Sequence, residues 1–95
     1  MFQDKFGNHI RFHEAIDLAT DRQYSTIEYT TIEHDEVIIE TTWLGPDAEA
    51  EEYFQSCVVL ESKTIFCCKY TTIEEAVRGH KVIVGTWLSQ PELVQ

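Results

Sequence analysis

The strongest constraint on the fold is an alternation of side-chain character in the middle of the chain. Four segments are rich in β-branched and aromatic residues, and in the first two the side chains alternate between two sides, as in half-buried β-strands. The segments span residues 24–33, 37–44, 53–60 and 64–70. Polar breaks at His34–Glu36 and Glu61–Lys63 would each turn the chain back, and Gly45–Asp47 would end the second segment. The sequence therefore predicts four antiparallel strands, arranged as two hairpins.

The pentapeptide YTTIE occurs twice, at Tyr29–Glu33 and at Tyr70–Glu74, but the residues that follow it differ. The first copy continues the alternation, whereas the second opens a stretch with apolar residues at helical spacing. The capping box Thr72–Glu75 would start that helix, and Gly79 and Gly85 within it mark either close packing or an early end. The apolar stripe consists of Ile73, Ala76, Val77, His80, Ile83, Val84 and Trp87. The two copies are therefore interpreted as different elements, not as a duplicated unit.

A shorter helix is predicted within residues 10–20, with Asn8 as a candidate cap. Four apolar residues would share one face of it: Phe12, Ala15, Ile16 and Ala19. A chain of 95 residues is long enough for one modest core. The predicted fold is a single α+β domain, residues 1–95, in which a four-stranded antiparallel sheet of two hairpins carries a short N-terminal helix and a C-terminal helix packed on one face.

The net charge of −10 is unevenly distributed along the chain. Residues 26–56 hold nine acidic residues and neither Lys nor Arg, whereas residues 57–95 hold four of each sign. A field of this sign repels nucleic acid and anionic membranes and attracts basic protein surfaces. The charge therefore predicts a protein partner with a basic surface, and no direct nucleic-acid or membrane binding.

Two features bear on where the protein resides. No apolar run approaches the ~18 residues that span a bilayer, and the first ten residues lack the basic and then apolar stretch of a signal peptide. We therefore expect an intracellular, cytoplasmic protein with reduced thiols at Cys57, Cys67 and Cys68. A turn near Ser62 would place Cys57 opposite Cys67 or Cys68, depending on the loop length.

The residues that most often carry chemistry are sparse. His9 and His13 have the spacing of helical zinc ligands, but no third ligand follows at a recognisable distance. Cys67 and Cys68 lie in a predicted strand, away from a helix N-terminus that would lower a thiol pKa, which leaves a pair of Cys68 with His80 as the alternative. We interpret His80 as a residue at the edge of the core. The expectation is no catalysis, no cofactor and no metal.

Two motifs resemble a group of short proteins of unassigned function encoded by tailed bacteriophages and prophages. The first motif is Thr-x-Trp-Leu-Gly, and the second is an aromatic-x-Thr-x-Glu-Glu-Ala-x-x-Gly-His entry to a terminal helix. The matching residues are Thr41, Trp43, Leu44, Gly45, Tyr70, Thr72, Glu74, Glu75, Ala76, Gly79 and His80. The match covers roughly half the chain, but the loop after Gly45 is acidic here where the group is rich in Gly and Pro. The resemblance implies a viral origin and an accessory role inside the host cell, and it implies no reaction.

These observations lead to a functional expectation. The carboxylates of the central segment, spaced by two along a hairpin, would imitate a phosphate backbone and occupy the basic groove of a host nucleic-acid-handling or defence protein. The expected contact residues are Glu28, Glu33, Asp35, Glu36, Glu40, Glu49, Glu51 and Glu52, with Trp43 and Tyr53 as aromatic anchors. The alternative is a structural or virion-associated accessory protein that self-associates as a homodimer through a strand edge or helix, with incidental acidity.

Overall fold

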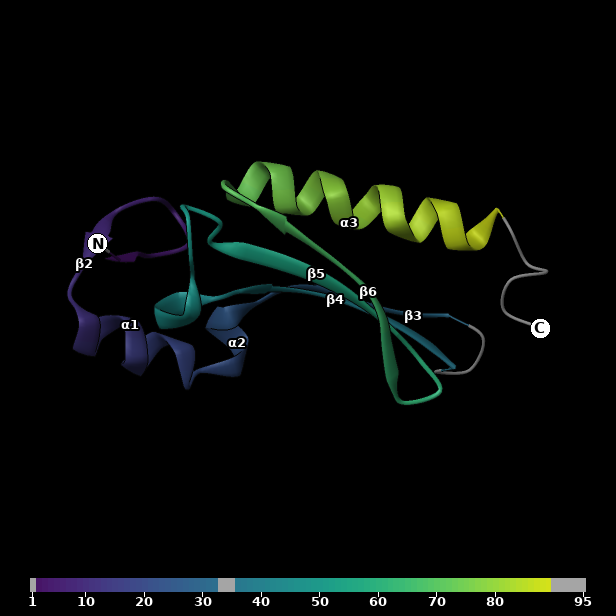
Figure 1. Ribbon diagram of the computed structural model, residues 1–95, viewed down its shortest axis with the longest axis horizontal. Helices are drawn as coiled ribbons and strands as arrows, with labels where there is room; N and C mark the ends of the chain where they lie inside the picture. Colours follow the sequence, from purple (N-terminus) through teal and green to yellow (C-terminus); the bar gives the residue numbers. More distant parts are fainter. Residues whose placement is uncertain (1, 33–35, 90–95) are drawn as a thin grey trace.

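The predicted sheet is present, with its strands in sequence order. The structure, a computed structural model, describes residues 2–32 and 36–89. The antiparallel strands are β3 (Thr26–Ile32), β4 (Val37–Trp43), β5 (Phe54–Leu60) and β6 (Lys63–Tyr70), and neighbours in the chain are neighbours in the sheet. The helix α3 (Ile73–Leu88) lies along one face of this sheet (Figure 1). The fold is therefore α+β, as the alternation and the terminal helical stripe predicted.

Both hairpins are confirmed by the strand register. Ile32 lies opposite Val37, and the turn residues between them at 33–35 lie outside the described part of the chain. In the second hairpin Leu60 lies opposite Lys63, so the loop contains only two residues. These residues, Glu61 and Ser62, have positive φ angles of 50° and 67°. Such a backbone has the twist that lets a two-residue loop join antiparallel strands.

The two central strands, β4 and β5, are buried on one face only. Along β4, and along β5 as far as Val58, every second side chain is buried, and those between are half-buried. The buried set is Val37, Ile39, Thr41, Trp43, Phe54, Ser56 and Val58. The α3 residues Ile83, Val84 and Trp87 pack against the apolar members of this face. The apolar stripe predicted for the terminal helix therefore covers the sheet.

The terminal helix starts as its capping box predicted. The Glu75 backbone N–H donates to Thr72 Oγ1 (3.2 Å), and the Thr72 N–H donates to Glu75 Oε1 (3.1 Å). The helix does not end early at its glycines. A Cβ at Gly79 would collide with the Tyr70 ring, whereas a Cβ at Gly85 would have no atom within 4 Å. Close packing on the sheet therefore applies to Gly79 alone.

The N-terminal third packs at one end of the sheet and shares a core cluster with it. It contains the two-residue strands β1 (Phe2–Gln3) and β2 (His9–Ile10), and the helices α1 (Phe12–Ala19) and α2 (Arg22–Ser25). The short helix predicted within residues 10–20 is α1. It contacts the 3₁₀ helix η1 (Gly45–Asp47) beyond the end of β4, and its buried Ala15 belongs to the same core cluster as Trp43, Phe54 and Ala76 of α3 (Figure 1).

The candidate cap at Asn8 was wrong. Arg11 occupies the N-cap position, and its backbone N–H donates to Glu14 Oε1 (2.9 Å). Asn8 instead closes the β1–β2 turn, where its backbone carbonyl accepts from the Asp4 N–H and its N–H donates to Asp4 Oδ1, both at 2.9 Å. An Asn side chain serves turns as readily as caps, and the sequence pattern does not separate the two roles.

Within the described residues, no helix is both long and apolar enough to cross a membrane.

Candidate functional site

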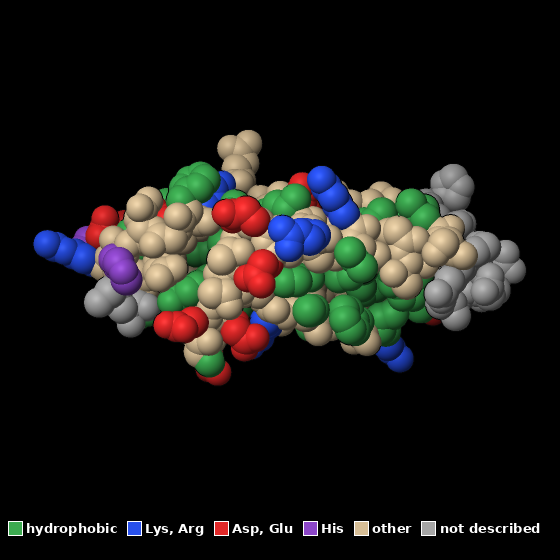
Figure 2. All heavy atoms as spheres, turned by 90° about the horizontal axis from the view of Figure 1, so that it is seen from above, with side chains coloured by type: hydrophobic (Ala, Val, Ile, Leu, Met, Phe, Trp, Pro, Cys, Tyr) green, Lys and Arg blue, Asp and Glu red, His purple; other side chains and the backbone are tan. Residues whose placement is uncertain are grey.

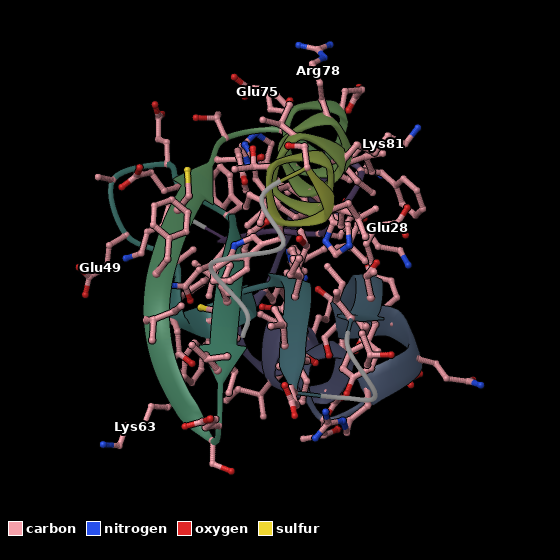
Figure 3. The ribbon with its side chains drawn as sticks, turned by 90° about the vertical axis from the view of Figure 1, so that its right-hand side faces the viewer. Glu28, Glu49, Lys63, Glu75, Arg78 and Lys81 are labelled. Atoms are coloured by element: carbon pink, nitrogen blue, oxygen red, sulfur yellow. The ribbon has the colours of Figure 1, made fainter. Side chains whose placement is uncertain are left out.

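The structure disperses the predicted acidic surface. Glu28 is half-buried on the β3 face that carries α3, whereas Glu40 lies on the other face of the sheet and pairs with Arg22 Nη2 at 3.6 Å. Glu36 is exposed beside the β3–β4 turn. Glu28 and Glu49 lie on opposite sides of the molecule (Figure 3). The β3–β4 acids therefore do not form one docking face, and Glu33 and Asp35 lie outside the described residues.

The predicted aromatic anchors belong to the core. Trp43 is only 3% exposed, and its indole Nε1–H donates to the Gln3 carbonyl (3.1 Å). Its ring meets the Tyr24 ring edge-on at a centroid distance of 5.2 Å. The prediction of Trp43 as a surface anchor was therefore wrong. Tyr53 is also buried, at 9% exposure, but it lines a cleft that opens to solvent.

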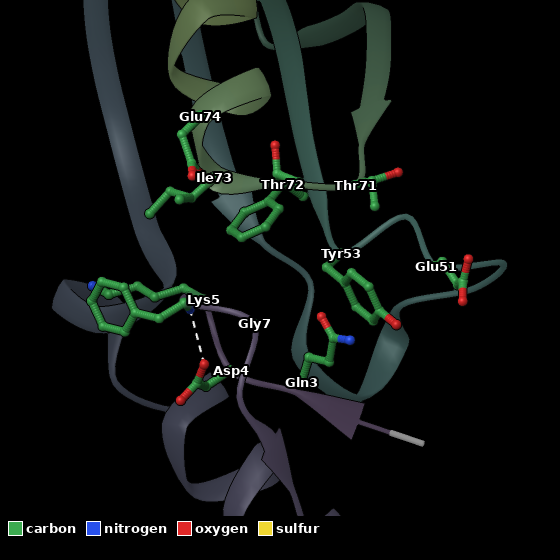
Figure 4. Close-up of a pocket in the computed structure, with 12 residues that line it drawn as sticks. Gln3, Asp4, Lys5, Gly7, Glu51, Tyr53, Thr71, Thr72, Ile73 and Glu74 are labelled. Carbon is green, nitrogen blue, oxygen red and sulfur yellow. Dashed lines mark hydrogen bonds between the residues drawn. The ribbon is translucent and has the colours of Figure 1, made fainter.

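That cleft is the feature that brings acidic residues together. It lies between the β1–β2 loop, the η1–β5 loop and the start of α3, and it has a volume of about 320 Å³ (Figure 4). Asp4, Glu51 and Glu74 contribute one carboxylate from each of these three segments. Of the predicted contact residues it therefore gathers Glu51 and Tyr53, with Glu49 and Glu52 in the same loop. We call this region the acidic cleft.

Lys5 is the one basic residue among those that line the acidic cleft, and its ammonium is engaged elsewhere. Lys5 Nζ donates to the Tyr24 carbonyl (3.3 Å) and lies 4.3 Å from the centroid of the Tyr24 ring. The Asp4 carboxylate is fixed by N–H groups of Phe6 and Asn8, both at 2.9 Å. Figure 4 shows the Asp4 contact at the floor of the cleft. The cleft is thus negative, and hydrogen bonds hold the Asp4 side chain of its lining in place.

A series of hydrogen-bonded polar side chains lies in the core beneath α3. His80 Nε2 is 2.8 Å from Thr30 Oγ1, and His80 Nδ1 is 2.7 Å from Thr41 Oγ1. Thr41 Oγ1 in turn lies 2.5 Å from Ser56 Oγ. Burial lowers the pKa of His80, and the nearby Glu28 carboxylate partly opposes this. Thr41 and Ser56 have no exposed surface and His80 is almost fully buried, so we assign these contacts a structural role.

His9 and His13 lie in different elements. His9 lies in β2 and His13 in α1, so the two do not share one helical face as their spacing suggested. Over residues 2–32 and 36–89, no group of three or more His, Cys, Asp or Glu side chains is placed to hold a metal ion.

The sequence missed Asp4 and Glu74 as members of the acidic cleft. Both come from segments far from the acidic third, and only the tertiary fold brings them together. No periodicity or motif marks them. The net charge of the chain does not indicate where on the fold acidic residues from different segments meet.

No family model matches the chain, and neither the curated proteins nor the solved structures contain a match.

Proposed function

We propose that this chain is a small accessory protein of the phage type, which acts in the host cytoplasm by binding another protein and not by catalysis. Its docking surface is the acidic cleft with the adjoining η1–β5 loop. Its partner is a protein with a basic surface, and the class we favour is a host nucleic-acid-handling or defence protein whose basic groove the chain would occupy. The phage context rests on the resemblance of the TTWLG and YTTIEEAVRGH motifs.

The observation that carries the proposal is the unbalanced charge of the acidic cleft. Asp4, Glu51 and Glu74 line a cavity of about 320 Å³ in which Lys5 is the one basic lining residue. A cavity of this size accepts a protruding side chain. A Lys or Arg of a partner that enters it would meet opposite charge in surroundings partly shielded from water, where such contacts are stronger than on an open surface.

A pull-down from bacterial lysate, followed by affinity measurements on the captured partner, tests the proposal. The double substitution Glu49→Lys with Glu51→Lys reverses charge at the cleft. We expect it to weaken binding by about tenfold, because exposed charge pairs contribute ~0.2–1 kcal/mol each and tenfold is ~1.4 kcal/mol. We also expect a flatter dependence of affinity on salt, since fewer charges are screened.

The control carries the same change in net charge elsewhere. Asp17→Lys with Glu61→Lys alters two exposed residues that do not line the cleft. A similar loss of affinity in both double variants would show that only net charge matters and would contradict a localised site. Glu36→Lys, at the other end of β4, should leave the affinity unchanged, and a large loss there would restore the β3–β4 hairpin as the docking surface.

Self-association is the second candidate function, and β6 favours it. This strand is an edge of the sheet, and its residues Ile65 and Phe66 are 48% and 50% exposed. Phe66 lines a groove shared with Val82 of α3, and Figure 2 shows hydrophobic side chains at this surface among charged ones. An exposed apolar edge strand is prone to pair with another strand. Sedimentation at several concentrations decides: a stable dimer that persists without a basic partner supports this function over the first.

A further inference from the structure

Two thiols face each other across the β5–β6 hairpin. Cys57 and Cys67 are direct partners in the antiparallel register, and their Sγ atoms are 2.6 Å apart. A disulfide bond is ~2.05 Å long, so the two sulfur atoms need to move only slightly closer together to form one. Val58, the next residue along β5, is buried beneath α3, and successive side chains of a strand point to opposite faces. The pair therefore lies on the face away from the helix.

The third cysteine is kept out of this pair by the sheet. Cys68 is the register partner of Ser56, and it lines a groove with Tyr70 and Gly79 on the α3 side. Its side chain therefore lies on the other face of β6. Of the two partners that the sequence left open for Cys57, the register selects Cys67.

We propose that Cys57 and Cys67 form a reversible disulfide site that takes a low-molecular-weight disulfide, such as glutathione disulfide, as its oxidant. The Cys67 thiolate attacks one sulfur of the oxidant, which forms a mixed disulfide and releases one glutathione thiolate that takes up a proton. Cys57 Sγ then attacks Cys67 Sγ, the mixed disulfide breaks, and the second glutathione leaves with the proton of Cys57. The two thiols lose two electrons, and the oxidant is reduced to two molecules of glutathione.

The order of these steps follows from the surroundings of Cys57. Burial, then the hydrogen bond and charge of Cys67, and then the charge of Glu40 together raise the pKa of Cys57 to about 12. Cys57 is therefore protonated at neutral pH, and the exposed Cys67 is the residue that meets the oxidant. Once Cys67 is in the mixed disulfide, it no longer bears a charge, and Cys57 gives up its proton more readily.

The bond would tie the edge strand β6 to β5 near the middle of the hairpin. A cross-link restricts the unfolded chain, so the oxidised protein should be harder to unfold than the reduced one. The site is independent of the acidic cleft, because neither thiol lines it. Failure of one proposal therefore leaves the other standing.

Alkylation and melting in glutathione redox buffers test the proposal. The reduced protein has three free thiols. After equilibration with glutathione disulfide, we expect mass spectrometry to find one alkylated thiol, at Cys68, and no bound glutathione. We expect a melting temperature roughly 10 °C higher, with both changes reversed by dithiothreitol.

Serine variants supply the matched controls. Cys68→Ser should still form the bond and show the full shift in melting temperature, whereas Cys57→Ser should stop at a glutathione adduct on Cys67 with no such shift. Two results would overturn the proposal. One is a wild-type protein that keeps a glutathione adduct without an internal bond, and the other is Cys68→Ser with no change in alkylation or melting.

Discussion

His80 joins three strands to α3 through hydroxyl groups. Its two ring nitrogens contact Thr30 of β3 and Thr41 of β4, and Thr41 is hydrogen-bonded in turn to Ser56 of β5. In the described part of the chain, every buried side-chain nitrogen or oxygen has a hydrogen-bond partner. A buried polar group with a partner costs little, whereas one left alone costs about 1–3 kcal/mol. His80 therefore holds the register between helix and sheet through polar contacts within an otherwise apolar layer.

The burial of His80 makes the stability of the fold depend on pH. Its pKa in the folded protein is lowered from the ordinary value of 6.5, so between the two pKa values the unfolded chain binds more protons. The contribution of His80 to the free energy of unfolding should then be fully present above pH 6.5. Between pH 6.5 and the lower pKa of the folded state, the free energy of unfolding should fall by up to about 1.4 kcal/mol for each unit that the pH drops. Urea unfolding at a series of pH values between 7.5 and about 5 measures this.

The control separates His80 from the other histidines. His80→Gln keeps hydrogen-bonding groups and should flatten the dependence on pH in this window. His9→Gln with His13→Gln, both at exposed positions, should keep it. A wild-type curve that is flat between pH 7.5 and about 5 would contradict the expected protonation of the unfolded chain.

At this scale the sequence predicted that His80 lies at the core but did not predict its contacts. His80 was placed on the apolar stripe, but its two hydroxyl partners, Thr30 of β3 and Thr41 of β4, carry no signature along the chain. For the acidic residues of the β3–β4 hairpin, the prediction that they share a face was wrong. Glu28 and Glu40 were grouped because they belong to one hairpin, yet Glu28 is the register partner of Thr41, whose side chain is buried under α3, while Glu40 is the partner of Tyr29 on the other face. A shift of one position along a strand reverses the face.

The two glycines of α3 give a matched pair of tests at the scale of the element. Gly79→Ala would push a methyl group into the Tyr70 ring and should lower the free energy of unfolding by ~1–3 kcal/mol, as overpacking does. Gly85→Ala meets no atom within 4 Å and should raise it by ~0.5–1 kcal/mol, because Ala is the better helix former. Urea denaturation of both variants measures the difference. Equal effects in the two variants would mean that Tyr70 does not pack against Gly79.

The elements that the sequence predicted are those with a long periodic pattern. Strands of seven or eight residues and the sixteen-residue α3 carry enough repeats to show their period. The pairs β1 and β2 and the four-residue α2 do not. They form because Asp4 and Asp21 accept backbone N–H groups locally and because Trp43 and Tyr24 provide an apolar surface to cover. The contact with Trp43 and Tyr24 is a tertiary one, so it cannot be recognised from a short stretch of the sequence.

For the whole molecule, the excess negative charge has few internal partners. Arg22–Glu40 is the one ion pair among the described residues, and the net charge is −10. Like charges that lie within the range of their fields repel one another in the compact state and less so in the unfolded chain. The fold therefore contains an electrostatic strain that salt can relieve.

Neutral salt should stabilise the protein. Raising sodium chloride from ~10 mM to ~150 mM shortens the screening distance from ~30 Å to ~8 Å, and we expect the melting temperature to rise by a few degrees. Differential scanning fluorimetry measures the shift. The double variant Asp17→Lys with Glu61→Lys has a net charge that is four units less negative, because each substitution removes one negative charge and adds one positive charge. It should show a smaller rise. A melting temperature that is unchanged or lower in salt would mean that the carboxylates are already compensated in the folded state.

The order of elements along the chain has a consequence for biosynthesis. The sheet is complete at Tyr70, and α3, which covers its apolar face of Ile39 and Val58, follows it. Until α3 packs on the sheet, the hydrophobic side chains of this face are exposed to solvent, as in a partly folded intermediate. A chaperone that binds exposed apolar surface would bind the chain in that state.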